Sequence, residues 1–156
     1  MFLYKNKQQA FSFIELIIVI AIIGIFAVVG SGSWGEYNKR KALETDVQSI
    51  LATLEEARSN TLQSVDSSKH GVHFEASRFV LFKGASYNSS DPENEIHDLQ
   101  KTSLSPIALS GGESNVIFER LSGKTNQPGT ITVSVIGNPA ASKVITIYGT
   151  GIVEFR

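Results

Sequence analysis

The chain has 156 residues, a length that fits one domain, and its 42% hydrophobic and 19% charged residues are those of an ordinary globular protein. Its 14 basic and 15 acidic residues give a net charge of −1, which excludes a general electrostatic attraction for nucleic acid or for an acidic membrane surface. It contains no cysteine, so disulfides, thiolate metal sites and cysteine nucleophiles are excluded as well.

The first part of the chain is strongly apolar. Residues 16–35 carry no charge, and residues 16–29 are apolar throughout. About 20 such residues in a helix span the hydrocarbon core of a bilayer. The preceding segment, residues 1–10, is short and polar and carries Lys5 and Lys7. Three interpretations fit this pattern: a secretory signal that is cleaved off, a simple signal anchor, and a short leader followed by a retained helix.

Glu15 helps to distinguish these interpretations, because it stands directly before the apolar run and far from the nearest preceding base, Lys7. An acidic residue at the centre of a membrane helix costs about 2.5–3.5 kcal/mol on insertion scales, and somewhat less near its end. A simple anchor gains nothing from such a residue, although Glu15 could also reach the membrane interface. Carboxylates within membranes usually have a partner, and we expect this partner to come from another copy of the chain.

Residues 10–25, AFSFIELIIVIAIIGI, resemble the type IV prepilin signature: a small residue before the cut, then an aromatic residue, three more residues and Glu. The resemblance implies cleavage between Ala10 and Phe11 by a prepilin peptidase and N-methylation of the new Phe11 amine. It also implies that Glu15 neutralises the Phe11 amine of a neighbouring subunit during filament assembly, since a buried charge pair is far less costly than a lone buried charge. The chain departs from the family pattern in having Ala10 where Gly is usual.

The same resemblance divides the chain into a leader at residues 1–10, a transmembrane and assembly helix at 11–35, and a periplasmic or extracellular head at 36–156. It implies a single pass through the inner (cytoplasmic) membrane with the N-terminus in the cytoplasm, and a filament location after assembly. The partners implied are other pilin or pseudopilin subunits, the prepilin peptidase, the assembly platform in the inner membrane, and membrane lipid. The basic residues before and after the apolar run are too evenly divided to set this orientation alone.

An amphipathic helix is predicted after the apolar segment. Three glycines within residues 30–35 first weaken the helix, at about 1 kcal/mol each. Apolar residues then recur at spacings of mostly three and four, with polar residues between them, over about 25 residues. The stripe consists of Leu43, Val47, Ile50, Leu51, Leu54, Ala57, Leu62 and Val65.

The rest of the chain is predicted to form about seven short strands joined by turns, which gives an α+β fold. The strands are expected at residues 72–74, 79–82, 104–109, 116–119, 130–136, 143–148 and 152–155. Residues 88–95 are polar and rich in turn-forming types, so we expect a loop there. Residues 71–74, 116–123 and 145–154 are similar to GspH/FimT-type minor pilins and pseudopilins, which implies a pilin-like head of two sheets packed on the helix.

Motifs that suggest chemistry are weak. Residues 122–125 imitate the end of a phosphate-binding loop, but Phe118 occupies the position where that loop requires Gly. Metal ligands could be sought among His70, His73, Glu75 and His97, of which His73 and Glu75 would share one face of a strand. No second acid–histidine pair and no nucleophile elbow accompany them. We therefore expect no catalytic residue, no metal and no cofactor.

A nucleic-acid partner is not expected either. The head keeps 12 of the 14 basic and 14 of the 15 acidic residues, because only Lys5, Lys7 and Glu15 precede residue 36, and its net charge is −2. Its one basic cluster, residues 39–41, lies where lipid headgroups would explain it. Too few cations remain for binding driven by counterion release.

The sequence as a whole favours a non-enzymatic structural subunit, a minor pilin or pseudopilin, of a type IV filament or type II secretion pseudopilus. Two alternatives remain open: a DNA-binding minor pilin for natural transformation, and a signal-anchored, β-rich ligand-binding domain. A membrane-anchored hydrolase is a weaker alternative, since no pair of nucleophile and base can be nominated.

Overall fold

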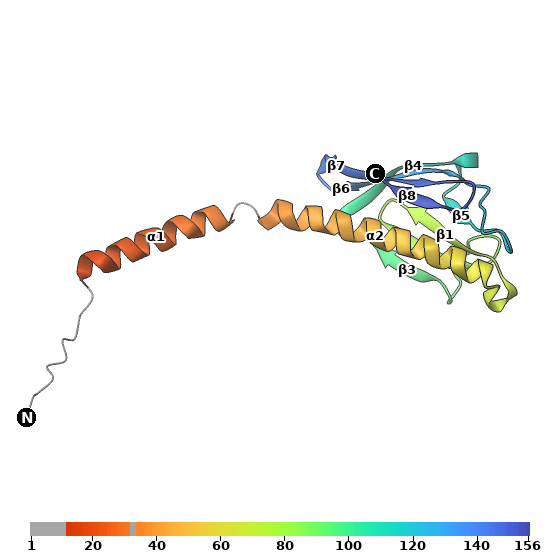
Figure 1. The fold of residues 1–156 in the computed structure, drawn as a ribbon, viewed down its shortest axis with the longest axis horizontal. Helices are drawn as coiled ribbons and strands as arrows, with labels where there is room; N and C mark the ends of the chain where they lie inside the picture. Colours follow the sequence, from red (N-terminus) through yellow and green to blue (C-terminus); the bar gives the residue numbers. More distant parts are fainter. Residues whose placement is uncertain (1–11, 32–33) are drawn as a thin grey trace, which may run out of the picture. The chain divides into compact units, whose positions relative to one another are not determined.

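The computed structural model describes residues 12–31 and 34–156, and the chain divides into two compact units, Met1–Tyr37 and Asn38–Arg156. The fold is α+β, as predicted (Figure 1). The helices are α1 (Phe13–Ser31) and α2 (Trp34–Leu62), followed by the short 3-10 turn η1 (Val65–Ser67). The strands are β1 (His70–Glu75), β2 (Arg78–Lys83), β3 (Glu95–Asp98), β4 (Thr102–Leu109), β5 (Asn115–Ile117), β6 (Gly129–Val135), β7 (Asn138–Ile147) and β8 (Val153–Phe155), with the 3-10 turn η2 (Ser110–Gly112) before β5.

The eight strands form two antiparallel sheets of four. Sheet A has the order β3-β2-β1-β5, and sheet B has the order β4-β6-β7-β8. The two sheets are interleaved along the chain, because β4 enters sheet B before β5 completes sheet A. In Figure 1, α2 runs across both sheets, with the strands of sheet B above it and β3 below it in this view.

The apolar stripe of α2 joins the two sheets into one core. Leu43, Val47, Ile50, Leu54 and Ala57 are buried and belong to one cluster with residues of both sheets. Their spacing of four, three, four and three places them on one side of the helix. Full burial of a Leu or Ile side chain contributes about 1.5–3 kcal/mol, so this stripe is the main attachment of the helix to the sheets.

The stripe is shorter than predicted. Leu62 and Val65 were expected to continue it, but α2 ends at Leu62 and both side chains are partly exposed. The chain leaves the helix through Ser64, Asp66 and Ser67, which all have positive φ. This sharp turn redirects the chain into β1 and ends the helical periodicity.

The seven predicted strands are present within a few residues of their expected bounds, and the structure adds β3 as an eighth. The sequence suggested a loop up to Glu95 because β3 has no buried face: Glu95, Ile96 and Asp98 are all exposed. Backbone pairing with β2, in a register that sets Val80 opposite Ile96, holds it in place. A strand defined by pairing alone leaves no hydrophobic pattern in the sequence.

Candidate assembly interface

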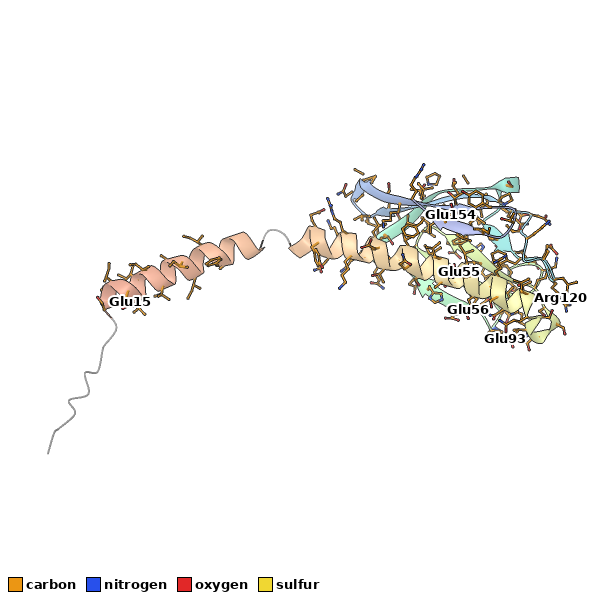
Figure 2. All side chains as sticks on the ribbon, viewed as in Figure 1. Glu15, Glu55, Glu56, Glu93, Arg120 and Glu154 are labelled. Atoms are coloured by element: carbon orange, nitrogen blue, oxygen red, sulfur yellow. The ribbon has the colours of Figure 1, made fainter. Side chains whose placement is uncertain are left out.

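Helix α1 begins immediately after the predicted cleavage site. The Ser12 carbonyl accepts hydrogen bonds from the backbone N–H groups of Glu15 (3.0 Å) and Leu16 (3.2 Å), which closes the first turn. Ala10 and Phe11 lie outside the described residues, so the cleavage and methylation sites predicted there stay predictions. Glu15 is exposed at the N-terminal end of α1, as Figure 2 shows. A negative charge is favoured there by the helix dipole.

The surface of α1 is apolar on every side. All large apolar side chains between Phe13 and Phe26 are exposed, with exposed fractions of 45% to 77%. Because successive helical residues are rotated by about 100°, the run from Leu16 to Ile20 alone places apolar side chains all round the helix. A helix of this kind has no polar face to present to water, and such a surface marks a site of burial against other molecules.

No helix in residues 12–31 and 34–156 meets the length and the hydropathy that a bilayer-spanning segment needs.

The electrostatic position of Glu15 is simple in sequence terms, because it is the one charged residue between Lys7 and Glu36. No other charged side chain of this segment can therefore neutralise it. Its predicted pairing with the Phe11 amine of a neighbour stays a prediction.

The histidines of the head lie in different places. His73 and Glu75 share one face of β1, as their spacing predicted, with Nε2 and Oε1 3.5 Å apart. The His73 ring stacks on Tyr87 at 4.0 Å, and its Nδ1 lies 2.6 Å from Asn115 Oδ1. Arg78 donates two hydrogen bonds to the Glu75 carboxylate, and these lower the pKa of Glu75. The Glu75 carboxylate is therefore occupied by hydrogen bonds from Arg78, which is typical of a residue that stabilises the fold.

His97 lies on the opposite face of sheet A from His73. It pairs in register with Phe79, whereas His73 pairs with Val80, and successive residues of β2 point to opposite faces. The His97 ring stacks on Phe79 at 4.8 Å, and its Nε2 lies 3.3 Å from Glu95. The four residues considered as metal ligands thus do not converge on one point.

His70 is buried where α2 meets β1. Its backbone N–H donates to Thr61 Oγ1 at 2.8 Å, and its ring Nδ1 has no hydrogen-bond partner within the described part of the chain. Burial lowers the pKa of His70, and the nearby Lys83 lowers it further, against smaller opposing effects of Asp66 and Glu56. The neutral imidazole is therefore the form that the folded head favours.

The comparisons with known proteins bear on both units. The family described as "Prokaryotic N-terminal methylation motif" matches residues 5–31. Two crystal structures of the type IV minor pilin FimU from Pseudomonas aeruginosa (strain PAO1) resemble the chain at 15% identity, with TM-scores of 0.57 and 0.59. They cover 73% and 77% of this chain and 92% of the FimU chains. No curated protein sequence matches.

The chain is prepilin-like, with the fold of a type IV minor pilin. The resemblance carried by residues 10–25 is thereby confirmed at the level of the motif, and the predicted pilin-like head is confirmed at the level of the fold. At 15% identity the likeness to FimU concerns the fold alone.

The minor-pilin fold brings three loops together at the end of the head where α2 ends. The turn between β5 and β6 is held by a hydrogen bond from Arg58 Nε to the Gly123 carbonyl (3.2 Å) and one from Arg120 Nη1 to the Ser67 carbonyl (3.0 Å). Lys69 forms an ion pair with Glu119 at 2.7 Å. The segment that imitated a phosphate-binding loop belongs to this turn, and strand β6 follows it where such a loop requires a helix.

The same end of this prepilin-like chain carries a group of partly or fully exposed apolar side chains that sequence patterns did not single out. We call them the apical patch, which consists of Leu62, Val65, Leu121, Tyr148 and Ile152. The turn between β7 and β8 touches the β5–β6 turn, since Thr125 N–H donates to the Gly149 carbonyl at 3.2 Å. These residues come from three distant parts of the sequence, so no local pattern could have grouped them.

Proposed function

We propose that the chain is a structural subunit, a minor pilin or pseudopilin, of a type IV filament or a type II secretion pseudopilus. The observation that carries this proposal is the surface of α1, which is apolar on every side and exposed, with Glu15 in its first turn. The head buries its own apolar residues, whereas α1 needs the apolar surfaces of other molecules. Other subunits with the same helix supply such surfaces in a fibre.

Processing is the first step of the proposed mechanism. Cleavage between Ala10 and Phe11 by a prepilin peptidase creates a new amine four residues before Glu15, and N-methylation then modifies it. The match of residues 5–31 to the methylation motif supports this step, because that range contains both residues. Alanine is small enough to stand in for the glycine that usually precedes the cut.

Storage and assembly follow. We propose from the sequence that residues 11–35 hold the subunit in the inner membrane, with the N-terminus in the cytoplasm and the head on the periplasmic or extracellular side. During assembly, α1 packs against the helices of neighbouring subunits, and Glu15 pairs with the Phe11 amine of one neighbour. A lone buried charge costs several kcal/mol, so this pairing favours one axial register over all others.

The test of assembly is the ratio of chain in sheared filaments to chain in the membrane pool. Glu15→Gln keeps the size of the side chain and removes its charge, and Glu15→Val makes the segment more apolar. Both variants should insert and fold normally but enter filaments poorly. Glu55, an exposed carboxylate on α2 (Figure 2), supplies the matched control, and Glu55→Gln should leave the ratio unchanged. Normal assembly of Glu15→Val would remove the proposed role of the charge.

Processing has its own test. Ala10→Gly should be cleaved at least as well as the natural chain, whereas Ala10→Leu should accumulate in the unprocessed form. N-terminal sequencing of the mature chain should give Phe11. A mature start near Gly32 would instead support an ordinary secretory signal, and equal cleavage of all three chains would argue against a prepilin leader.

A further inference from the structure

Leu121 is the most unusual residue of the apical patch. Its side chain is 89% exposed and its φ is +68°, in the left-handed region that bulky residues rarely occupy. An unfavourable backbone conformation persists only where the surrounding structure imposes it, and such residues gather at functional sites. Here both the conformation and the exposure of a large apolar side chain are unfavourable, and neither benefits the isolated head.

The turn that carries Leu121 is firmly held. Gly123 N–H donates to the Glu119 carbonyl at 2.9 Å, and Glu119 N–H donates to the Lys124 carbonyl at 2.8 Å. Arg120 and Glu119 anchor the turn to Ser67 and Lys69 by the contacts described above. Leu121 is thus presented by a preorganised turn, so little conformational entropy is lost when a partner covers it.

The exposed positive charges next to Leu121 favour a partner surface that is acidic. Arg120 precedes it, Lys124 follows three residues later, and both are exposed (Arg120 is labelled in Figure 2). Within the part of the chain that the structure describes, Lys124 forms no ion pair. A fitting partner therefore presents an apolar side chain beside a carboxylate.

Strand β3 of the same chain has this character. Ile96 is 54% exposed and points to the same face of β3 as the exposed Asp98, whereas Glu95 points to the other face, where its Oε1 lies 3.3 Å from His97 Nε2. Asp98 lies opposite Arg78 in the register with β2, but Arg78 donates its hydrogen bonds to Glu75, and Asp98 forms no ion pair among residues 12–31 and 34–156. β3 is also an edge strand, since β2 is its sole neighbour in sheet A. The edge therefore offers both an apolar contact and acidic side chains to another molecule.

We propose that the apical patch of one subunit docks on the β3 edge of a second copy of the chain. Leu121 packs against Ile96, and Lys124 faces Asp98, which lies on the same face of β3 as Ile96. Two different surfaces meet in this contact, so it is heterologous, and repetition of such a contact generates an open helical array. The inference rests on the proposed function, because a filament brings copies of the chain into repeated contact.

The absence of cysteine from the chain allows a direct test. Two differently tagged full-length copies, Lys124→Cys and Asp98→Cys, are expressed together, and disulfide-linked dimers are measured in the membrane and filament fractions. These substitutions replace one charge pair and keep both apolar anchors. Glu113, another exposed carboxylate, supplies the control pair Lys124→Cys with Glu113→Cys. The expected result is a several-fold excess of dimers over the control pair.

A second set of variants tests the anchor without unfolding the head. Leu121→Gly suits the positive φ and removes the side chain, so it should lower the dimer yield to that of the control pair. Ile136→Ala, at a residue 55% exposed in another turn, should leave the yield unchanged. A yield equal to the control, insensitivity to Leu121→Gly, or cross-linking of Lys124→Cys to a different protein would each overturn the proposal. If the copies enter filaments but are not cross-linked, the docking contact is contradicted and the proposed function is not. If cross-linked copies never enter filaments, the proposed function is contradicted.

Discussion

Helices α1 and α2 place their apolar residues in opposite environments. In α2, the stripe from Leu43 to Ala57 is buried against two sheets of the same chain. In α1, the large apolar side chains from Phe13 to Phe26 are exposed. The head thus buries the apolar stripe of its own helix, whereas α1 keeps its large apolar side chains exposed. Under the proposed function, the difference separates residues that stabilise the subunit from residues that join subunits, and each prediction below tests that separation.

The largest effect should come from truncating one leucine in each helix. Leu54 is fully buried and Leu16 is 53% exposed. Leu54→Ala should lower the free energy of unfolding of the head by about 2–5 kcal/mol, because it removes packed methyl groups and leaves a cavity. Leu16→Ala should leave that free energy unchanged and lower filament incorporation. Urea denaturation of both variants measures the free energy of unfolding, and the amount of chain in sheared filaments measures incorporation. Equal destabilisation by the two substitutions would contradict the distinction between the helices.

Replacing a glycine by alanine should destabilise the head but not α1. At Gly129 a Cβ would overlap the Ala108 carbonyl oxygen and lie 2.7 Å from Leu109 Cα, whereas at Gly24 nothing lies within 4 Å. Gly129→Ala should cost about 1–3 kcal/mol or more of head stability, because the backbone of β4 has to move. Gly24→Ala should favour the α1 helix by about 1 kcal/mol without changing the head. Thermal unfolding of the head and circular dichroism of the helix report the two outcomes.

Acidification should weaken the head through His70. Burial holds the pKa of His70 below its usual value, so the unfolded chain takes up the proton first as the pH falls below about 6.5. The stability contributed by neutral His70 is present above that pH and is lost as the pH falls through the folded pKa. Unfolding measured at several pH values should show a shallower acid slope for His70→Gln than for the natural chain. Identical slopes would show that His70 is not the group that titrates.

The smallest effect concerns Leu121, the most exposed large apolar residue that the structure describes. Leu121→Gly should leave the free energy of unfolding unchanged or raise it by up to about 1 kcal/mol, because glycine relieves the left-handed conformation while gaining freedom in the unfolded chain. A matched measurement on Leu54→Gly should show strong destabilisation. Marked destabilisation by Leu121→Gly would mean that the side chain stabilises the head itself.

The sequence predicted the elements whose patterns are local. The spacing of Leu43, Val47, Ile50, Leu54 and Ala57 predicted the buried face of α2. Alternation predicted β6, and short apolar runs between turns predicted the other strands apart from β3. The motif at residues 10–25 was specific enough to indicate the prepilin-like start, which the match over residues 5–31 confirms.

Features that depend on contacts between distant residues were not predictable in this way. β3 consists of Glu95, Ile96, His97 and Asp98, has no alternation of apolar and polar residues, and is defined by pairing with β2. The apical patch depends on contacts such as that between Arg58 and Gly123, which are 65 residues apart in the sequence. The positive φ of Leu121 is also invisible to sequence reasoning, since the usual marker of that conformation is glycine.

The interleaving of the two sheets has a consequence for how the head is made. β4 belongs to sheet B but is synthesised before β5, so neither sheet is encoded by one uninterrupted segment. The core around the stripe of α2 is incomplete until β6 and β7 have followed, because these strands contribute Ile131 and Ile145 to it. Such non-local pairing makes folding slow and cooperative, so no stable half-head is expected on the way. A chain cut short before β7 would lack Ile145 and Ile147, so we expect it to leave part of the apolar side of α2 without its partners and to be degraded faster than the full chain.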